Sequence, residues 1–167
     1  MSLLGLVRGR RPLGIGALAC LATAVVLEPG EKPDSERVID ECGSQVAAAL
    51  HFVYEIFLQT RSEEVVPPYL RGIFEEYCAY VDRMETPPEK RFQQIHTGHC
   101  TFLVPAERRF VTKAGIQGVC FVGTPDEIID RLRTAERAGL REVTLLPPMA
   151  YARKVYKDFA EKVMAKY

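Results

Sequence analysis

The order of apolar and polar positions predicts a buried strand followed by a helix in the C-terminal third of the chain. Val119-Cys120-Phe121-Val122 is a continuous apolar run closed by Gly123, which is typical of a strand covered on both faces. A helix is expected directly afterwards. Thr124 can cap its first turn, Pro125 suits its first position, and Glu127 can complete a capping box with Thr124.

A second buried strand is expected after this helix. Gly139 is placed to end the helix in the left-handed conformation, and residues 143–146 form another short apolar run. The apolar stripe of the helix consists of Ile128, Ile129, Leu132 and Ala135. We therefore predict a βαβ unit in which residues 119–122 and 143–146 are adjacent parallel strands.

The rest of the chain divides into elements at its prolines and glycines. We expect a strand at the end of the apolar run 13–27, a long amphipathic helix after Pro33, a second helix over residues 70–81, an irregular loop over residues 89–112, and a last helix over residues 149–166. Loops as long as the one over residues 89–112 are usually functional in compact domains.

Composition narrows the class of protein. A chain of 167 residues with 47% hydrophobic content is long enough for one domain, spanning residues 1–167. The 22 basic and 22 acidic side chains balance, which argues against nucleic acid or an anionic membrane as a partner. The five cysteines never form a C-x-x-C pair. They are expected to be reduced thiols, and the predicted location is cytoplasmic.

One feature of the N-terminus favours export instead. Arg8, Arg10 and Arg11 precede the apolar run, and Cys20 follows small residues as in a lipoprotein cleavage site. An exported lipoprotein is therefore an alternative. Against it, the run continues through Ala24-Val25-Val26-Leu27 into Pro29-Gly30, which favours a strand and turn, and it is shorter than the roughly 20 residues of a membrane-spanning helix.

The histidines raise the question of a metal. His96, His99 and Cys100 lie close together in the irregular loop, but a structural zinc site needs four ligands at paired spacings. The only other histidine is His51, which is distant in sequence and is expected to pair with Glu55 one helical turn away. The sequence therefore predicts no metal site.

Several stretches together resemble the luciferase-like monooxygenase family of flavin- or F420-dependent oxidoreductases, and the likeness runs over nearly the whole chain. The stretches are Val25-Val26-Leu27-Glu28-Pro29-Gly30-Glu31, Asp34-Ser35-Glu36-Arg37-Val38, His51-Phe52-Val53-Tyr54-Glu55, Ile95-His96-Thr97-Gly98-His99-Cys100, Val122-Gly123-Thr124-Pro125-Asp126-Glu127 and Glu142-Val143-Thr144-Leu145-Leu146-Pro147-Pro148. Members fold as (β/α)8 TIM barrels and act on small organic substrates with FMN or F420.

The resemblance implies an α/β fold made of the last three strands of such a barrel with long helices, because a complete barrel takes about 250 residues. It implies cofactor contacts at Gly123 and Thr124, where the phosphate of a cofactor meets a helix N-terminus. It also implies His96 and His99 as candidate catalytic residues that hydrogen-bond to the flavin or substrate; the alternative is that backbone carbonyls satisfy them.

A truncated barrel would leave its sheet edges open. A second copy of the chain or a complementary barrel half is therefore an expected partner, and an inactive or accessory fragment is the alternative to a self-sufficient oxidoreductase. Because a site that encloses the cofactor on one side only loses affinity, the isolated chain is expected to bind FMN or F420 weakly or not at all.

Overall fold

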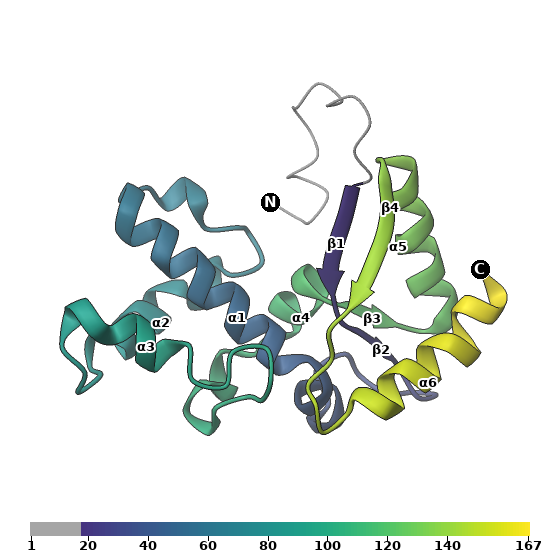
Figure 1. Cartoon of the computed structure of the whole chain (residues 1–167), viewed down its shortest axis with the longest axis horizontal. Helices are drawn as coiled ribbons and strands as arrows, with labels where there is room; N and C mark the ends of the chain where they lie inside the picture. Colours follow the sequence, from purple (N-terminus) through teal and green to yellow (C-terminus); the bar gives the residue numbers. More distant parts are fainter. Residues whose placement is uncertain (1–17) are drawn as a thin grey trace.

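Parallel strands lie at the centre of the computed structural model, which describes residues 18–167 (Figure 1). Thr23 interrupts the first extended segment and divides it into two strands, which pair with different neighbours. The strands are β1 (Leu18–Ala22), β2 (Ala24–Val26), β3 (Phe121–Gly123) and β4 (Leu140–Leu145). β1 pairs with β4 and β2 pairs with β3, both in parallel.

The predicted partial TIM barrel is wrong. Val122 pairs with Val25 in one sheet, and Val143 pairs with Cys20 in the other sheet. β3 and β4 are therefore not adjacent, whereas strands that follow one another in the chain are neighbours in a barrel. The observed architecture is an α/β arrangement of two small parallel sheets. The strand limits also differ, because Val119 ends a helix and the strand begins at Phe121.

Helices cover both faces of the paired strands β2 and β3 (Figure 1). On one face, α1 (Glu36–Thr60) and α4 (Lys113–Val119) pack against Val25 and Val122. On the other face, Ile128 of α5 (Pro125–Arg137) and Phe159 of α6 (Ala152–Lys162) contact a cluster that includes Phe121. Successive side chains of a strand point to opposite faces of the sheet, and here both faces are covered. Both strands therefore need continuous runs of apolar residues.

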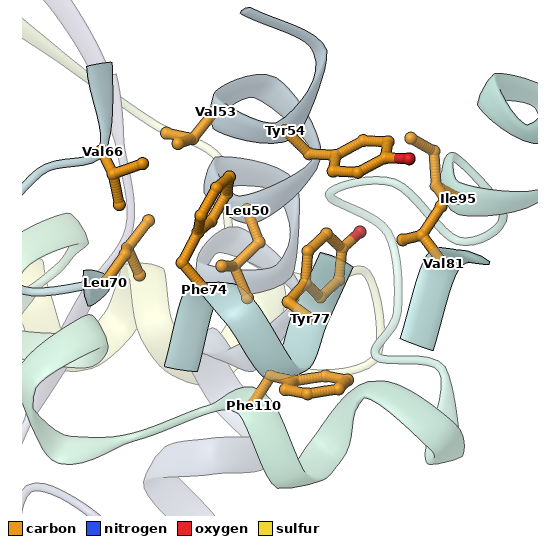
Figure 2. Close-up of a cluster of buried hydrophobic side chains, with 10 residues drawn as sticks. All are labelled: Leu50, Val53, Tyr54, Val66, Leu70, Phe74, Tyr77, Val81, Ile95 and Phe110. Atoms are coloured by element: carbon orange, nitrogen blue, oxygen red, sulfur yellow. The ribbon is translucent and has the colours of Figure 1, made fainter. Parts of the chain in front are cut away.

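A separate helical core lies beyond the strands, around the C-terminal half of α1 (Figure 1). Its remaining elements are α2 (Arg71–Asp82), α3 (Arg91–Ile95), and the short 3-10 helices η1 (Glu63–Val65) and η3 (Pro105–Phe110). Two further 3-10 helices are η2 (Pro88–Lys90), which precedes α3, and η4 (Met164–Lys166), which follows α6. Figure 2 shows the Tyr77 ring between Tyr54 and Phe110. Both neighbouring rings meet Tyr77 edge-on, at centroid distances of 6.0 and 5.3 Å. This aromatic packing fixes the loop over residues 89–112 against α1.

The predicted helices after Pro33 and over residues 70–81, the irregular loop with short helical pieces, and the last helix are all present. No helix within residues 18–167 is long and apolar enough to cross a membrane. The arginines of the alternative export signal, Arg8, Arg10 and Arg11, lie outside the described residues. Cys20 lies within β1 and pairs there with Val143.

The start of α5 has the predicted capping box. The Thr124 side chain accepts a hydrogen bond from the Glu127 backbone, and the Glu127 carboxylate accepts one from the Thr124 backbone at 2.7 Å. Thr124→Ala should therefore lower the free energy of unfolding by about 1 kcal/mol. Denaturant unfolding of the variant beside Thr134→Ala, in the exposed last turns of the same helix, measures the difference; equal losses in the two variants would contradict a specific role for the cap.

Candidate metal centre

The helical core brings the three histidines of the chain together. His51 projects from α1 beside Leu50, which is fully buried in that core. Ile95, the last residue of α3, and Phe110, the last residue of η3, are buried in the same core at 2% and 1% exposure. Because both ends of the loop are held by apolar anchors, the segment between them, which includes His96 and His99, has to lie against α1.

A tight turn fixes the spacing of the two loop histidines. The His99 backbone N–H donates to the His96 carbonyl at 3.1 Å, and the N–H groups of Thr101 and Phe102 donate to the Gly98 carbonyl. Gly98 has a φ of 73°, in the left-handed region that favours glycine. A β-carbon at this position would meet the Phe102 carbonyl oxygen at 2.7 Å, so the turn requires glycine on two grounds.

The three imidazoles form a compact triangle. Ring centroids are 5.6 Å apart for His51 with His96, 5.6 Å for His51 with His99, and 4.9 Å for His96 with His99. One nitrogen of each ring lies within 4.8 Å of one nitrogen of each of the others. Nδ1 of His51 lies 3.3 Å from Nδ1 of His99.

Carboxylates hold the outer nitrogens of two of the rings. Nε2 of His51 lies 3.0 Å from Oε1 of Glu107, and these two side chains are only 1% and 4% exposed. An ionised carboxylate can only accept, so with Glu107 ionised, Nε2 of His51 carries the proton and Nδ1 keeps its lone pair. On the solvent side, Nε2 of His96 lies 3.3 Å from Oε1 of Glu55. Carboxylates in this outer position are the usual partners of metal-binding histidines, because they fix the tautomer and increase the basicity of the ring.

The electrostatics of the cluster favour neutral imidazole. Partial burial lowers the pKa of His99 below its ordinary value, and the neighbouring His51 and His96 lower that pKa further. The neutral form is the one that binds metal ions, so the lowered pKa keeps His99 able to bind at a lower pH than an isolated histidine.

The structure brings the candidate catalytic residues His96 and His99 together with His51, which the sequence predicts to pair with Glu55. Glu55 contacts His96 instead of the expected His51, and His51 contacts Glu107. The sequence predicts no metal site because His51 is distant from His96 and His99 in the chain. In the structure the three histidines lie together, so that argument no longer applies. The sequence assigns no role to Glu107. It stands next to Arg108 and Arg109 in an irregular loop, so no repeat of apolar positions marks its side chain as buried.

Gly123 and Thr124, the candidate cofactor-binding residues, lie at the carboxyl end of β3, on the strand side of the molecule (Figure 1). The Glu127 carboxylate occupies the space beside them. Its Oε2 accepts hydrogen bonds from both the backbone and the hydroxyl of Thr124 and lies 2.9 Å from where a Gly123 β-carbon would be. A cofactor phosphate bound there would have to displace this carboxylate, which repels a second anion.

Charged side chains also fill the carboxyl edge next to β2. The Arg37 guanidinium donates to the Val26 carbonyl at 3.1 Å and pairs with both Glu31 and the buried Glu41. The hydrogen bond from Arg37 lowers the pKa of Glu31 to about 2. In open parallel sheets, ligands bind at this edge. At this edge the Val26 carbonyl and the carboxylates of Glu31 and Glu41 already have Arg37 as a partner.

Comparison of the chain with protein-family models, with curated protein sequences and with solved structures finds no match. The resemblance to the luciferase-like family therefore stays a prediction from the sequence.

Proposed function

We propose that this chain is a metal-binding protein that holds one divalent transition-metal ion between His51, His96 and His99. The observation that carries the proposal is the 3.3 Å separation of Nδ1 of His51 and Nδ1 of His99. Two nitrogen ligands of a tetrahedral zinc ion, each at 2.0–2.1 Å, are about 3.3–3.4 Å apart. The distance between the two nitrogens therefore suits a shared ion.

Three features of the surroundings support the same conclusion. The other ligand separations are within 4.8 Å, and the side chain of His96 is 38% exposed, so it can rotate toward the other two when an ion binds. Glu107 holds the ring of His51 from behind. The donor set consists of imidazole nitrogens, which select Zn²⁺, Co²⁺, Ni²⁺ or Cu²⁺ over Mg²⁺ and Ca²⁺, since the latter two ions prefer oxygen ligands.

A competition titration tests the proposal. The metal-free protein, added to Zn²⁺ bound by a chromophoric chelator, should withdraw one equivalent of the ion per chain. Mg²⁺ at the same concentration should not compete. If the chelator keeps all of its zinc, or if the stoichiometry does not depend on the histidines, the proposal fails, and the cluster is then a set of hydrogen-bonded imidazoles.

Glu107→Gln should weaken zinc binding by about 10- to 100-fold, because the neutral amide no longer increases the basicity of His51. The same competition titration measures the change, and Glu89→Gln, which alters an exposed carboxylate of η2, is the matched control. Equal affinities for the two variants would contradict the proposed role of Glu107.

The flavin- or F420-dependent oxidoreductase activity implied by the sequence resemblance is a second proposal. The observation that favours it is that Glu28-Pro29-Gly30, Thr124 and Leu146-Pro147 all follow the carboxyl ends of parallel strands, where α/β proteins bind ligands. It would act on a small organic substrate, alone or together with a second copy or a complementary half. An inactive accessory fragment is the alternative.

Fluorescence titration with FMN and with F420 tests this second proposal. We expect weak binding or none for the isolated chain, because the Glu127 carboxylate lies where a phosphate would contact Gly123 and Thr124. Saturable binding of one cofactor per chain would establish a self-sufficient cofactor site. If binding appears only in a dimer, the site is assembled from two copies.

A further inference from the structure

The histidine cluster provides three ligands, whereas structural zinc sites are closed by four. Among residues 18–167, no cysteine or carboxylate joins the three histidines in the group whose ligand atoms lie within 4.8 Å of one another. Cys100 follows His99 in the chain, but its sulfur is not part of that group. An ion bound by the cluster would therefore keep one position for a water molecule.

That position faces solvent. The side chain of His51 is 1% exposed and closes the inner side of the cluster together with Glu107. The side chain of His96 is 38% exposed, and His99 lies at the surface of the same turn. A ligand can therefore approach from the side of His96 and His99 without any rearrangement of the core.

An exposed aromatic ring lies on the turn that carries His96 and His99. Two carbons of the Phe102 ring are 2.8 and 2.9 Å from where a β-carbon of Gly98 would be, so the ring lies on the turn between His96 and His99. Phe102 is nevertheless 54% exposed. Such a ring can hold an apolar or aromatic group of a ligand whose reacting atom is at the metal.

We propose that the cluster, loaded with Zn²⁺, is a hydrolytic centre for small carboxylic esters whose apolar or aryl part contacts Phe102. This inference rests on the metal binding proposed above. Three neutral imidazoles leave the full double charge of the ion available, and such an ion lowers the pKa of its bound water to about 7 and polarises a carbonyl oxygen.

The step needs no oxidant or reductant. The zinc-bound water loses a proton to the solvent, and its oxygen forms a bond with the carbonyl carbon of the ester. The bond between that carbon and the alcohol oxygen then breaks with its electron pair on the oxygen, which takes a proton from water. The products are one carboxylic acid and one alcohol, and water is the only co-reactant.

Hydrolysis of 4-nitrophenyl acetate by the zinc-loaded full-length chain tests the inference. We expect saturable hydrolysis that requires one equivalent of Zn²⁺ per chain and stops when a chelator removes the ion. Phe102→Ala should raise KM by roughly 10-fold with little change in kcat, since it removes one apolar contact with the substrate. Thr97→Ala, an exposed change in the same turn, is the control and should leave both constants unchanged.

A second readout does not depend on activity. Azide added to the Co²⁺-loaded protein should shift the visible absorption spectrum, because it replaces the water on an open site. If zinc binds with one equivalent but azide leaves the spectrum unchanged, or hydrolysis does not exceed that of free Zn²⁺, the hydrolytic inference is overturned and the metal-binding proposal stands. If zinc does not bind, both are overturned.

Discussion

His99→Ala is expected to weaken zinc binding by roughly 100-fold or more. His99 supplies a nitrogen that already lies at the separation of tetrahedral ligands, 3.3 Å from Nδ1 of His51. The substitution removes a direct bond to the ion. The loss of affinity should therefore exceed the roughly 10- to 100-fold expected when a hydrogen-bond partner of a ligand, such as Glu107, is changed. His99 lies at the surface, so the variant should fold normally.

The competition titration, carried out beside His96→Ala and the control Thr97→Ala, measures this loss. The two histidine variants should lose zinc affinity, while the control should bind as the unmodified protein does. Retention of full affinity by His99→Ala would show that the ion, if bound, is held elsewhere.

His51→Ala is expected to lower the free energy of unfolding by about 1–3 kcal/mol even in the absence of metal, because it leaves the buried carboxyl group of Glu107 without its hydrogen-bond partner. The side chain of Glu107 is 4% exposed, and its hydrogen bond to Nε2 of His51 compensates for the loss of solvent. The emptied space beside Leu50 and Tyr77 adds to the loss of stability.

Denaturant unfolding of the metal-free proteins measures this effect. The double variant with leucine at positions 51 and 107 should recover most of the lost stability, because replacing both partners of a buried pair by apolar side chains is often nearly neutral. A loss below about 1 kcal/mol for His51→Ala, or no recovery in the double variant, would contradict the view that the buried Glu107 depends on its hydrogen bond with His51.

Local features of the fold could be predicted from the sequence, whereas strand order could not. The capping box of Thr124 and Glu127 is formed by residues three apart, so its signal lies within one turn of helix. The position of a strand in a sheet depends instead on distant partners. An apolar run such as Val119-Cys120-Phe121-Val122 fits any covered position, and the sequence did not indicate that β3 would pair with β2 and β4 with β1.

The candidate site shows the same division. His96 and His99 were identified because they are close in the chain, and the turn at Gly98 keeps them close in space. His51 is 45 positions from His96 and joins them only because the buried anchors Ile95 and Phe110 pack the loop against α1. That packing is a tertiary contact, and it produces no characteristic spacing of residues in the sequence from which the cluster could be predicted. A histidine next to the apolar stripe of a helix, at Leu50, was the one available signal for His51.

The most direct test of the metal centre is an anomalous difference map from crystals of the protein grown or soaked with Zn²⁺ and measured at the zinc absorption edge. We predict one strong peak per chain, about 2.0–2.1 Å from a ring nitrogen of each of His51, His96 and His99, with Glu107 still on Nε2 of His51. A map with no peak between the three rings, or with its only peaks at other side chains, would contradict the proposal.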